Sequence, residues 1–535
     1  MENKLQKFFL AAGAILFAGS IGYLCFQYSD ISTLAAAVSD EYGFIPVMIK
    51  MKQSLLGHDV KGTFSYAFFN YGFLYFLVNT LLSWGFVGDS SSVGQVVIPR
   101  LVSAAAAVGT MIVVYRMARI TMDKMSALGV VGLLLSAPAI WMIGTWFHPD
   151  FPMTLFVLIG MLALLRDDFK FGRSYWVASV IMGVAIGIKF QAVTFLPVFF
   201  LYGLAHLGSG NPRPGRWHQP VLMSLGAVGL AGLVFVAMNP YLLHPQGLRA
   251  FIRFFEGNLV SMASNHGVVG VIPFHRRLDW CLFRPYLSGL VSLILATLAA
   301  VAVIRHFKSP GLRRYWVVGL SGLFVLVYSL VTINKMEAHY YLAAVIVTVA
   351  GLSPILNLGS ARRGLWVLSG LIGLNIGAHR PEFESLIHRP QYTAYVMHWA
   401  ESRREIAIKL SEILGPNDYL LASPKVLIEL NHIPIPMSHV IRIGGPIELR
   451  MIEPKSQLRY FNDLHIPPQP FIPMKAVIID KSDPYFDSRQ LDHLVDRVGY
   501  EEGARLITSL RSGFLGYSVA YEDGNVVIFV QRTPQ

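Results

Sequence analysis

The sequence predicts an α-helical multi-pass membrane protein, with about eleven spanning helices plus interfacial helices, that ends in a soluble α/β domain. Three observations support this fold class. First, 54% of the 535 residues are hydrophobic and only 14% are charged, whereas soluble domains average about 25% charged residues. Second, apolar runs long enough to cross a bilayer recur over residues 1–380. Third, these runs shorten and polar residues become frequent over residues 381–535.

Each apolar run begins and ends near polar or charged residues, as expected of a membrane-spanning helix. The first run follows Lys4 and Lys7 and is long for a cleaved signal peptide, so we expect it to be a retained signal anchor. The predicted spans are residues 8–27, 98–115, 126–146, 151–165, 175–188, 192–207, 219–238, 285–304, 315–332, 340–358 and 364–379.

The basic residues predict the orientation of these spans. They are concentrated in five short loops, and loops rich in lysine and arginine remain in the cytoplasm. The spans alternate correctly only if the aromatic segment 66–86 lies at the membrane surface or re-enters it, which is possible where protein or water satisfies its polar groups. The basic residues of the five loops are Arg116, Arg119 and Lys124; Arg166, Lys170 and Arg173; Arg213 and Arg216; Arg305, Lys308, Arg313 and Arg314; and Arg362 and Arg363.

This topology assigns residues 1–380 to a transmembrane domain and residues 381–535 to a soluble domain on the outer face. Short β-like runs at 419–422, 476–479 and 526–530 alternate with helical patterns at 486–498 and 501–511 in the second region. The net charge of +12 is explained by the loop cations, which form no patch with interleaved aromatic residues. We therefore expect no nucleic-acid partner.

Carboxylates with possible chemical roles cluster in the predicted outer loops. Asp40 and Glu41 follow the first span, and such a pair can accept a proton, bind a divalent ion, or simply be solvated. Asp150 lies in the sequence His148-Pro149-Asp150, where an outer loop meets a span. A carboxylate there needs a polar cavity or a partner, unless it caps the following helix. His148 is a candidate ligand or base, or an interface residue.

Basic residues occupy the same predicted face. Lys189 lies at the turn between two spans, and Lys335 precedes His339, Tyr340 and Tyr341 at another outer junction. Each lysine could bind a phosphate or could extend its ammonium group to the membrane surface. Arg276, Arg277 and Arg284 are candidates for the same task, or for a basic rim that faces lipid headgroups.

The order of these features resembles that of the GT-C membrane glycosyltransferases, in the bacterial branch that includes aminoarabinose transferases and is related to protein O-mannosyltransferases. The resemblance covers roughly residues 1–380, and it rests on the ordered set rather than on any one motif. The set comprises Asp40-Glu41, the aromatic stretch Tyr66 to Phe76, Pro99-Arg100-Leu101, His148-Pro149-Asp150, Gly183, Gly187 and Lys189, Asn239-Pro240-Tyr241, and Lys335 with His339-Tyr340-Tyr341.

The resemblance implies an enzyme that inverts the anomeric centre of a sugar taken from a polyprenyl-phosphate donor, on the periplasmic or lumenal side of the membrane. It makes Asp40 the general base, supported by Glu41, and Asp150 the second acidic residue of the site. The implied contacts to phosphate and sugar come from Lys189, Lys335, His339, Tyr340, Asn70 and Arg277. Asn70 ends a stretch that departs from the family, because the aminoarabinose enzymes carry Lys-Pro ahead of their aromatic residues.

We expect location in the inner (plasma) membrane, with the active site and the C-terminal domain outside the cytoplasm. The expected partners are membrane lipids, the lipid-linked sugar donor, and a glycan, lipid or protein acceptor. No cofactor is required by the sequence, although Asp40, Glu41, His148 and Asp150 permit a divalent metal ion. The alternative function is a lipid or solute transporter without transferase activity. Transporters usually place ionisable groups at the bilayer midplane in two related halves, a pattern that this chain lacks.

Overall fold

In the computed structural model the chain divides into two compact units, which are described separately. Unit 1 comprises Met1–Ser29, Gly43–Gly257 and Pro273–His388, and unit 2 comprises Asp30–Tyr42, Asn258–Ile272 and Arg389–Gln535. The structure describes residues 19–27, 39–64, 71–88, 93–207, 218–252, 255, 273–306, 310–333, 337–356, 361–387, 406, 408–415, 418–422, 440–442, 452–453, 473–481, 497–522 and 526–532.

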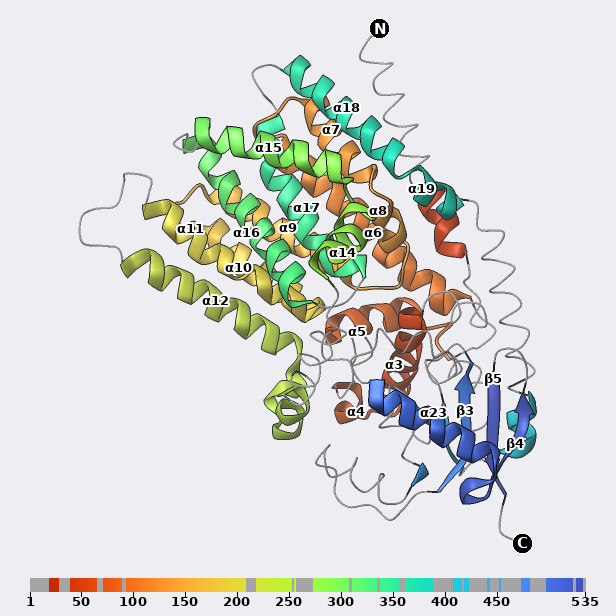
Figure 1. Ribbon diagram of the computed structural model, residues 1–535. Coiled ribbons are helices and arrows are strands. Elements are labelled where there is room, and N and C mark those ends of the chain that lie inside the picture. Colours follow the sequence, from red (N-terminus) through yellow and green to blue (C-terminus); the bar gives the residue numbers. More distant parts are fainter. Residues whose placement is uncertain are drawn as a thin grey trace. The chain divides into compact units, whose positions relative to one another are not determined.

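Unit 1 is a bundle of apolar helices (Figure 1), and it has a helix or a helix pair at each predicted span from 98–115 onward. Its larger helices are α6 (Gly94–Ala118), α7 (Lys124–Leu135), α8 (Pro138–Gly144), α9 (Asp150–Asp167), α10 (Arg173–Ile188), α11 (Pro197–Leu207), α12 (His218–Met238), α15 (Gly289–His306), α16 (Pro310–Thr332), α17 (Leu342–Leu352) and α18 (Ala361–Ala378). Shorter elements connect them: α5 (Phe73–Leu82), η1 (Phe190–Phe195), η2 (Pro240–Leu243), α14 (Phe274–Leu278), η3 (Asp279–Phe283), η4 (Ala338–Tyr341), η5 (Ser353–Leu356) and α19 (Arg380–Ile387). The polar segment before α5 forms α3 (Ser39–Leu56) and α4 (Val60–Phe64).

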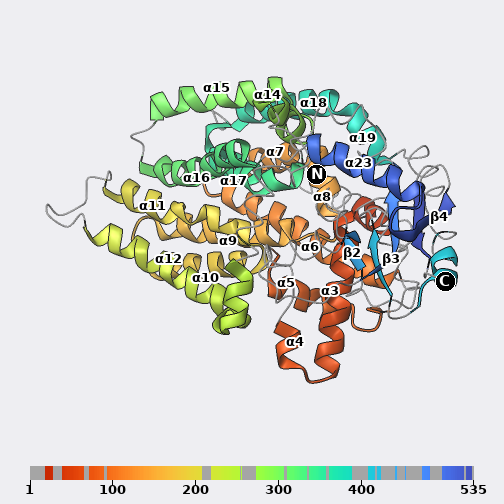
Figure 2. The ribbon, with the colours of Figure 1, turned by 60° about the horizontal axis from the view of Figure 1, so that its bottom comes forward.

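The helices pack in pairs that place the ends of distant segments side by side. Helix α10 packs against both α9 and α12, and α16 packs against α17 (Figures 1 and 2). Glycines allow the second pair to approach closely, since a Cβ on Gly351 would lie 2.2 Å from the backbone nitrogen of Gly319. Close packing of this kind is typical of membrane helices, which lack a hydrophobic driving force for association.

Five helices in the described part of the chain are long and apolar enough to cross a membrane. A sixth span is possible where α7 and α8 form a pair bent by 74°, because Pro138 begins a new helix there. The prediction of about eleven spans is not tested by this finding. Helix α5 has ten residues, which is about half the length of a span, and the predicted surface location of segment 66–86 stays a prediction.

Unit 2 contains a five-stranded sheet in the order β2-β1-β3-β5-β4. Strands β2 (Val440–Arg442), β1 (Tyr419–Ala422) and β3 (Met474–Asp480) are parallel, whereas β5 (Val526–Gln531) pairs antiparallel with β3 and with β4 (Tyr517–Glu522). The predicted β-like runs therefore coincide with β1, β3 and β5. The predicted helix 501–511 lies in α23 (Arg497–Arg511), and most of the predicted helix 486–498 lies outside the described residues.

Candidate active site

The centre of the site is a backbone contact between two of the predicted motifs. Tyr71 and Lys189 form an isolated antiparallel bridge, and the Gly72 amide donates a 2.7 Å hydrogen bond to the carbonyl oxygen of Ile188. Glycine is required at position 72, because a Cβ there would lie 1.5 Å from the carbonyl oxygen of Gly187. The aromatic stretch and the glycine-rich turn are thus held in direct contact.

Asn239, at the end of α12, stabilises this backbone contact through its side chain. Its side-chain oxygen accepts a hydrogen bond from the Phe73 amide at 3.4 Å, and its side-chain nitrogen donates to the carbonyl oxygen of Phe235 at 2.9 Å. The conformation of the Asn-Pro-Tyr sequence makes this possible, since Asn239 leaves the helix and Pro240 begins the short helix η2. Three predicted motifs therefore converge at Lys189.

Asp150 is the first residue of α9, and its side chain is fully buried. One carboxylate oxygen, Oδ1, lies 2.6 Å from Nζ of Lys189, which is 3% exposed, and Oδ2 contacts Nδ1 of His148. The N-cap position of α9 is occupied by Pro149, and the Asp150 oxygens lie against Lys189 and His148, so Asp150 is not the N-cap residue that the alternative interpretation made it. Asp150 precedes the predicted span 151–165. Burial opposes its ionisation, but Lys189 and His148 outweigh burial and hold the pKa of Asp150 below its usual value.

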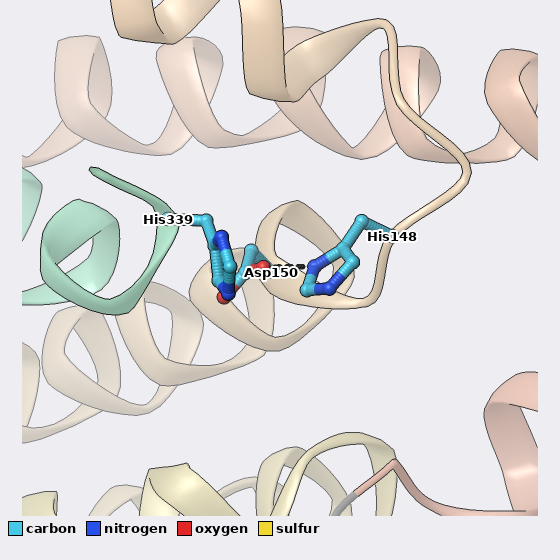
Figure 3. Close-up of side chains that lie close together, drawn as sticks. All are labelled: His148, Asp150 and His339. Atoms are coloured by element: carbon cyan, nitrogen blue, oxygen red, sulfur yellow. Dashed lines mark ion pairs between the residues drawn. The ribbon is translucent and has the colours of Figure 1, made fainter. Parts of the chain in front are cut away.

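Two histidines complete the group (Figure 3). The rings of His148 and His339 are 4.7 Å apart between centroids, and both side chains are buried. His148 comes from the loop before α9 and His339 from η4. Ser103 of α6 fixes the first of these segments, because its hydroxyl donates to the carbonyl oxygen of His148 at 3.0 Å. His339 also lies 3.4 Å from Oε2 of Glu337, a side chain that is 47% exposed.

Aromatic rings flank the Lys189 ammonium group. Its nitrogen lies 5.6 Å from the centroid of the Tyr71 ring and 5.4 Å from that of Tyr340, within the range of cation–π attraction. Gln191 links the Tyr340 segment to the turn, since its side-chain nitrogen donates to the Tyr340 carbonyl oxygen at 2.6 Å. A buried lysine with one carboxylate and two aromatic rings can present positive charge to an anion in a water-poor site.

The same group contains possible metal ligands. Three residues each offer one ligand atom, and these three atoms lie within 4.8 Å of one another: the residues are His148, Asp150 and His339. The donor set suits a transition-metal ion such as zinc. However, the Lys189 ammonium already neutralises Asp150, so a cation could bind there only if Lys189 moved away. Among the described side chains, Glu41 does not belong to this group of possible ligands.

For several of the remaining predicted residues, the side chain or the whole residue lies outside the described part of the chain. Asp40 lies in the first turn of α3 with a side chain outside the described set, whereas the Glu41 side chain is buried. Asn70 and Lys335 both lie outside the described residues. Arg277 is buried, which excludes a rim facing headgroups, and its guanidinium donates to the carbonyl oxygen of Val331 at 3.2 Å.

Sequence reasoning did not identify the polar residues that position the group. Ser103 and Gln191 both lie in or beside apolar helical runs, where a hydroxyl or amide side chain needs a hydrogen-bond partner. This requirement could have marked both residues as positioning residues from the sequence, but it does not indicate which group each of them binds. Tyr71 lay within the predicted aromatic stretch but was not distinguished from its neighbours.

Comparisons with known proteins agree with this architecture. Residues 92–239 match the family model described as dolichyl-phosphate-mannose-protein mannosyltransferase. The fold is similar to that of ArnT from Cupriavidus metallidurans bound to undecaprenyl phosphate, with a TM-score of 0.51 and 14% identity over 98% of this chain and 99% of that chain. The apo state of the same protein gives a TM-score of 0.50, also at 14% identity, over 98% of this chain and 100% of that chain.

A third solved structure aligns less closely. It is the archaeal oligosaccharyltransferase AglB from Archaeoglobus fulgidus in complex with an inhibitory peptide and a dolichol-phosphate, with a TM-score of 0.49 and 10% identity over 95% of this chain and 74% of that chain. Comparison of the sequence with curated proteins gives no significant match.

Proposed function

We propose that this chain, a member of the GT-C superfamily, is a membrane glycosyltransferase that moves a sugar from a polyprenyl-phosphate donor to an acceptor. The acceptor is a glycan, a lipid or a protein, and transfer takes place on the periplasmic side of the plasma membrane with inversion of the anomeric centre. The donor class is supported by the shared fold, since ArnT was solved with undecaprenyl phosphate, a polyprenyl phosphate.

One observation carries the proposal: the buried Lys189–Asp150 pair, surrounded by His148, His339 and two tyrosine rings. Breaking the bond between a sugar and a phosphate builds negative charge on the departing phosphate. A preorganised cation stabilises such charge most effectively where water is excluded. Lys189 is the buried cation of this group, and its ion pair with Asp150 holds it in position while no phosphate is bound.

The reaction in this proposal is a single displacement. The acceptor oxygen forms a bond to the anomeric carbon on the face opposite the phosphate, and the bond from that carbon to the phosphate oxygen breaks. The acceptor proton passes to the Asp40 carboxylate, and the electron pair of the broken bond leaves on the phosphate. One displacement inverts the configuration of the anomeric carbon. Glu41 assists Asp40.

The remaining predicted residues have supporting roles in this mechanism. Lys335 and Arg277 are proposed to contribute positive charge near the phosphate, Arg277 from its position beside the last carbonyl groups of α16. Tyr340, His339 and Asn70 are proposed to contact the sugar or the phosphate. Tyr340 also helps to position Lys189. Its ring faces the Lys189 ammonium group, and its carbonyl oxygen accepts a hydrogen bond from the Gln191 side chain.

Covalent transfer distinguishes this function from transport. Purified protein in vesicles would be given a radiolabelled sugar on polyprenyl phosphate, together with membrane acceptors. We expect label in a new covalent product, with the opposite anomeric configuration to that of the donor. Movement of intact donor across the bilayer without a new glycosidic bond would instead support the transporter alternative and refute the proposal.

A further inference from the structure

A long apolar cavity lies within unit 1, and the residues that line it are distinct from those of the candidate active site. It has a volume of about 430 Å³ and runs between α15, α16 and α17. Leu282 and Leu287 line one end, and Trp316 and Ile355 line the other. On α16 alone the lining extends from Trp316 to Leu326, a rise of about 15 Å at 1.5 Å per residue. Its length and apolar walls suit a hydrocarbon chain.

The Trp316 end of the cavity offers an unused hydrogen-bond donor. The Trp316 side chain is 7% exposed, and its indole Nε1 has no hydrogen-bond partner among the described residues. A buried indole N–H normally finds an acceptor, because leaving it without one is costly. A ligand that fits here therefore carries an acceptor oxygen close to the beginning of its hydrocarbon chain.

The same end carries a basic side chain. Arg313 precedes Trp316 by three residues, so the two side chains share one face of α16. Arg313 is half-buried, and no ion pair of its guanidinium is found within the described part of the chain. Basic pockets between membrane helices are known to bind anionic lipid headgroups.

We propose that this cavity binds one anionic phospholipid of the surrounding bilayer. One acyl chain fills the cavity, its ester carbonyl oxygen accepts the Trp316 indole hydrogen, and its headgroup lies against Arg313. A polyprenyl phosphate does not meet this requirement, because its chain is hydrocarbon up to the phosphate and has no acceptor oxygen for the Trp316 indole N–H within the cavity. The site is independent of the proposed transferase function.

The test uses the delipidated full-length protein in detergent. Phosphatidylglycerol and phosphatidylcholine with identical acyl chains would be titrated, and binding would be followed by native mass spectrometry and by the shift in melting temperature. Ala296→Phe places a ring in the cavity. Leu293→Phe is the control, because Leu293 is 65% exposed and the same ring is then added outside the cavity on α15. Trp316→Phe removes the indole donor together with part of the ring, with Trp366→Phe, a 70% exposed tryptophan, as its control.

We expect the wild type to bind phosphatidylglycerol more tightly than phosphatidylcholine. Ala296→Phe should abolish binding of both lipids, and Trp316→Phe should weaken both by about two- to tenfold, the range for one hydrogen bond. Arg313→Gln should reduce the preference for phosphatidylglycerol. Unchanged phosphatidylglycerol affinity in Trp316→Phe, or stabilisation by undecaprenyl phosphate but not by phosphatidylglycerol, would overturn the proposal. If Ala296→Phe fails to fold, the affinity of Trp316→Phe and the comparison of undecaprenyl phosphate with phosphatidylglycerol still test the proposal.

Discussion

Lys189 and Asp150 form an ion pair that is almost completely shielded from water, with 2.6 Å between Nζ and Oδ1 and side chains that are 4% and 0% exposed. Removing two charges from water is costly, and their attraction compensates only when the geometry is good and the remaining lone pairs are satisfied. At Asp150 the geometry of the pair is good, and the second carboxylate oxygen contacts Nδ1 of His148. The pair joins the beginning of α9 to the end of α10.

Removing one partner of this pair should destabilise the protein more than removing both. Lys189→Met leaves the Asp150 carboxylate buried without its cation, which typically costs roughly 3–5 kcal/mol. Asp150→Asn combined with Lys189→Met removes both charges and should recover most of the melting temperature, measured in detergent. Equal melting temperatures for the single and double variants would show that the unpaired Asp150 carboxylate is not costly at this position, and would contradict the prediction.

The double variant also separates folding from donor binding. If Lys189 meets the donor phosphate, the recovered protein should still bind a polyprenyl-phosphate sugar more weakly than the wild type does. A binding titration at matched protein concentration measures this. Wild-type donor affinity in a folded double variant would remove Lys189 from the proposed phosphate site.

The sequence predicted which residues need partners more successfully than it predicted the partners. Asp150 at the mouth of a helix required a cation or a cavity, and Lys189 required an anion or the membrane surface. Their pairing depends on the packing of α9 against α10 and on the close approach of Gly72 to Gly187, neither of which a helical pattern specifies. Helix positions were predicted well because apolar runs mark them directly. For Arg277 the sequence left open a phosphate contact or a basic rim that faces headgroups, and its burial beside the Val331 carbonyl oxygen could not be inferred from the helical pattern.

Gly72→Ala should disrupt the candidate active site through the backbone. The new Cβ would lie 1.5 Å from the Gly187 carbonyl oxygen, so the bridge between Tyr71 and Lys189 must separate. Overpacking typically costs about 1–3 kcal/mol, and a clash with backbone cannot relax by rotating a side chain. We expect a lower melting temperature and a loss of transfer activity. Gly85→Ala is the matched control, because no atom lies within 4 Å of its Cβ, and it should behave as the wild type.

Acid should weaken unit 2 through Glu522. Its carboxylate accepts two 2.7 Å hydrogen bonds from Arg511 and lies 2.8 Å from Lys481, which together lower the pKa of Glu522 to about 2. A glutamate in an unfolded chain has a pKa of about 4.3. The stabilisation is therefore complete above that value and is lost as the pH falls toward about 2.

The difference in stability between the wild type and Glu522→Gln should accordingly shrink between about pH 5 and pH 2. Hydrogen exchange of the β4 and β5 amides in the full-length protein measures this difference locally. Glu412→Gln, which breaks an exposed pair with Lys409, serves as the control and should change little with pH. A constant difference between wild type and Glu522→Gln over this range would contradict the assignment.

The topology prediction follows from the basic loops. Cysteines introduced at Ser91 and Ser423 should both react with a membrane-impermeant reagent in intact cells, because both positions are predicted to lie outside the cytoplasm. Both positions lie outside the described residues, so the experiment depends on the charge argument alone. Reaction at Ser91 only after permeabilisation would show that segment 66–86 crosses the membrane.

Asp40 carries the chemical part of the proposed function, and Asp40→Asn is its sharpest test. The substitution keeps the shape of the side chain and removes its ability to accept a proton. General-base assistance typically contributes 10²- to 10⁴-fold, so turnover should fall by about that factor while donor affinity is largely kept. Glu41→Gln should cause a smaller loss, since Glu41 only assists. The assay follows transfer of radiolabelled sugar from polyprenyl phosphate, with each variant matched to wild type in protein level and melting temperature.

The comparison between these two neighbours identifies the cause of a loss. A fall of similar size in Asp40→Asn and Glu41→Gln would indicate that the first turn of α3 is damaged, because the Glu41 side chain is buried and its replacement disturbs packing. A large fall in Asp40→Asn alone, with donor binding intact, separates proton transfer from folding and from phosphate recognition. Turnover should then also decrease on the acid side in the wild type, as the base becomes protonated, and this decrease should be absent from the residual activity of Asp40→Asn. Full activity in Asp40→Asn would mean that another group accepts the acceptor proton, and Asp40 would have no part in the mechanism.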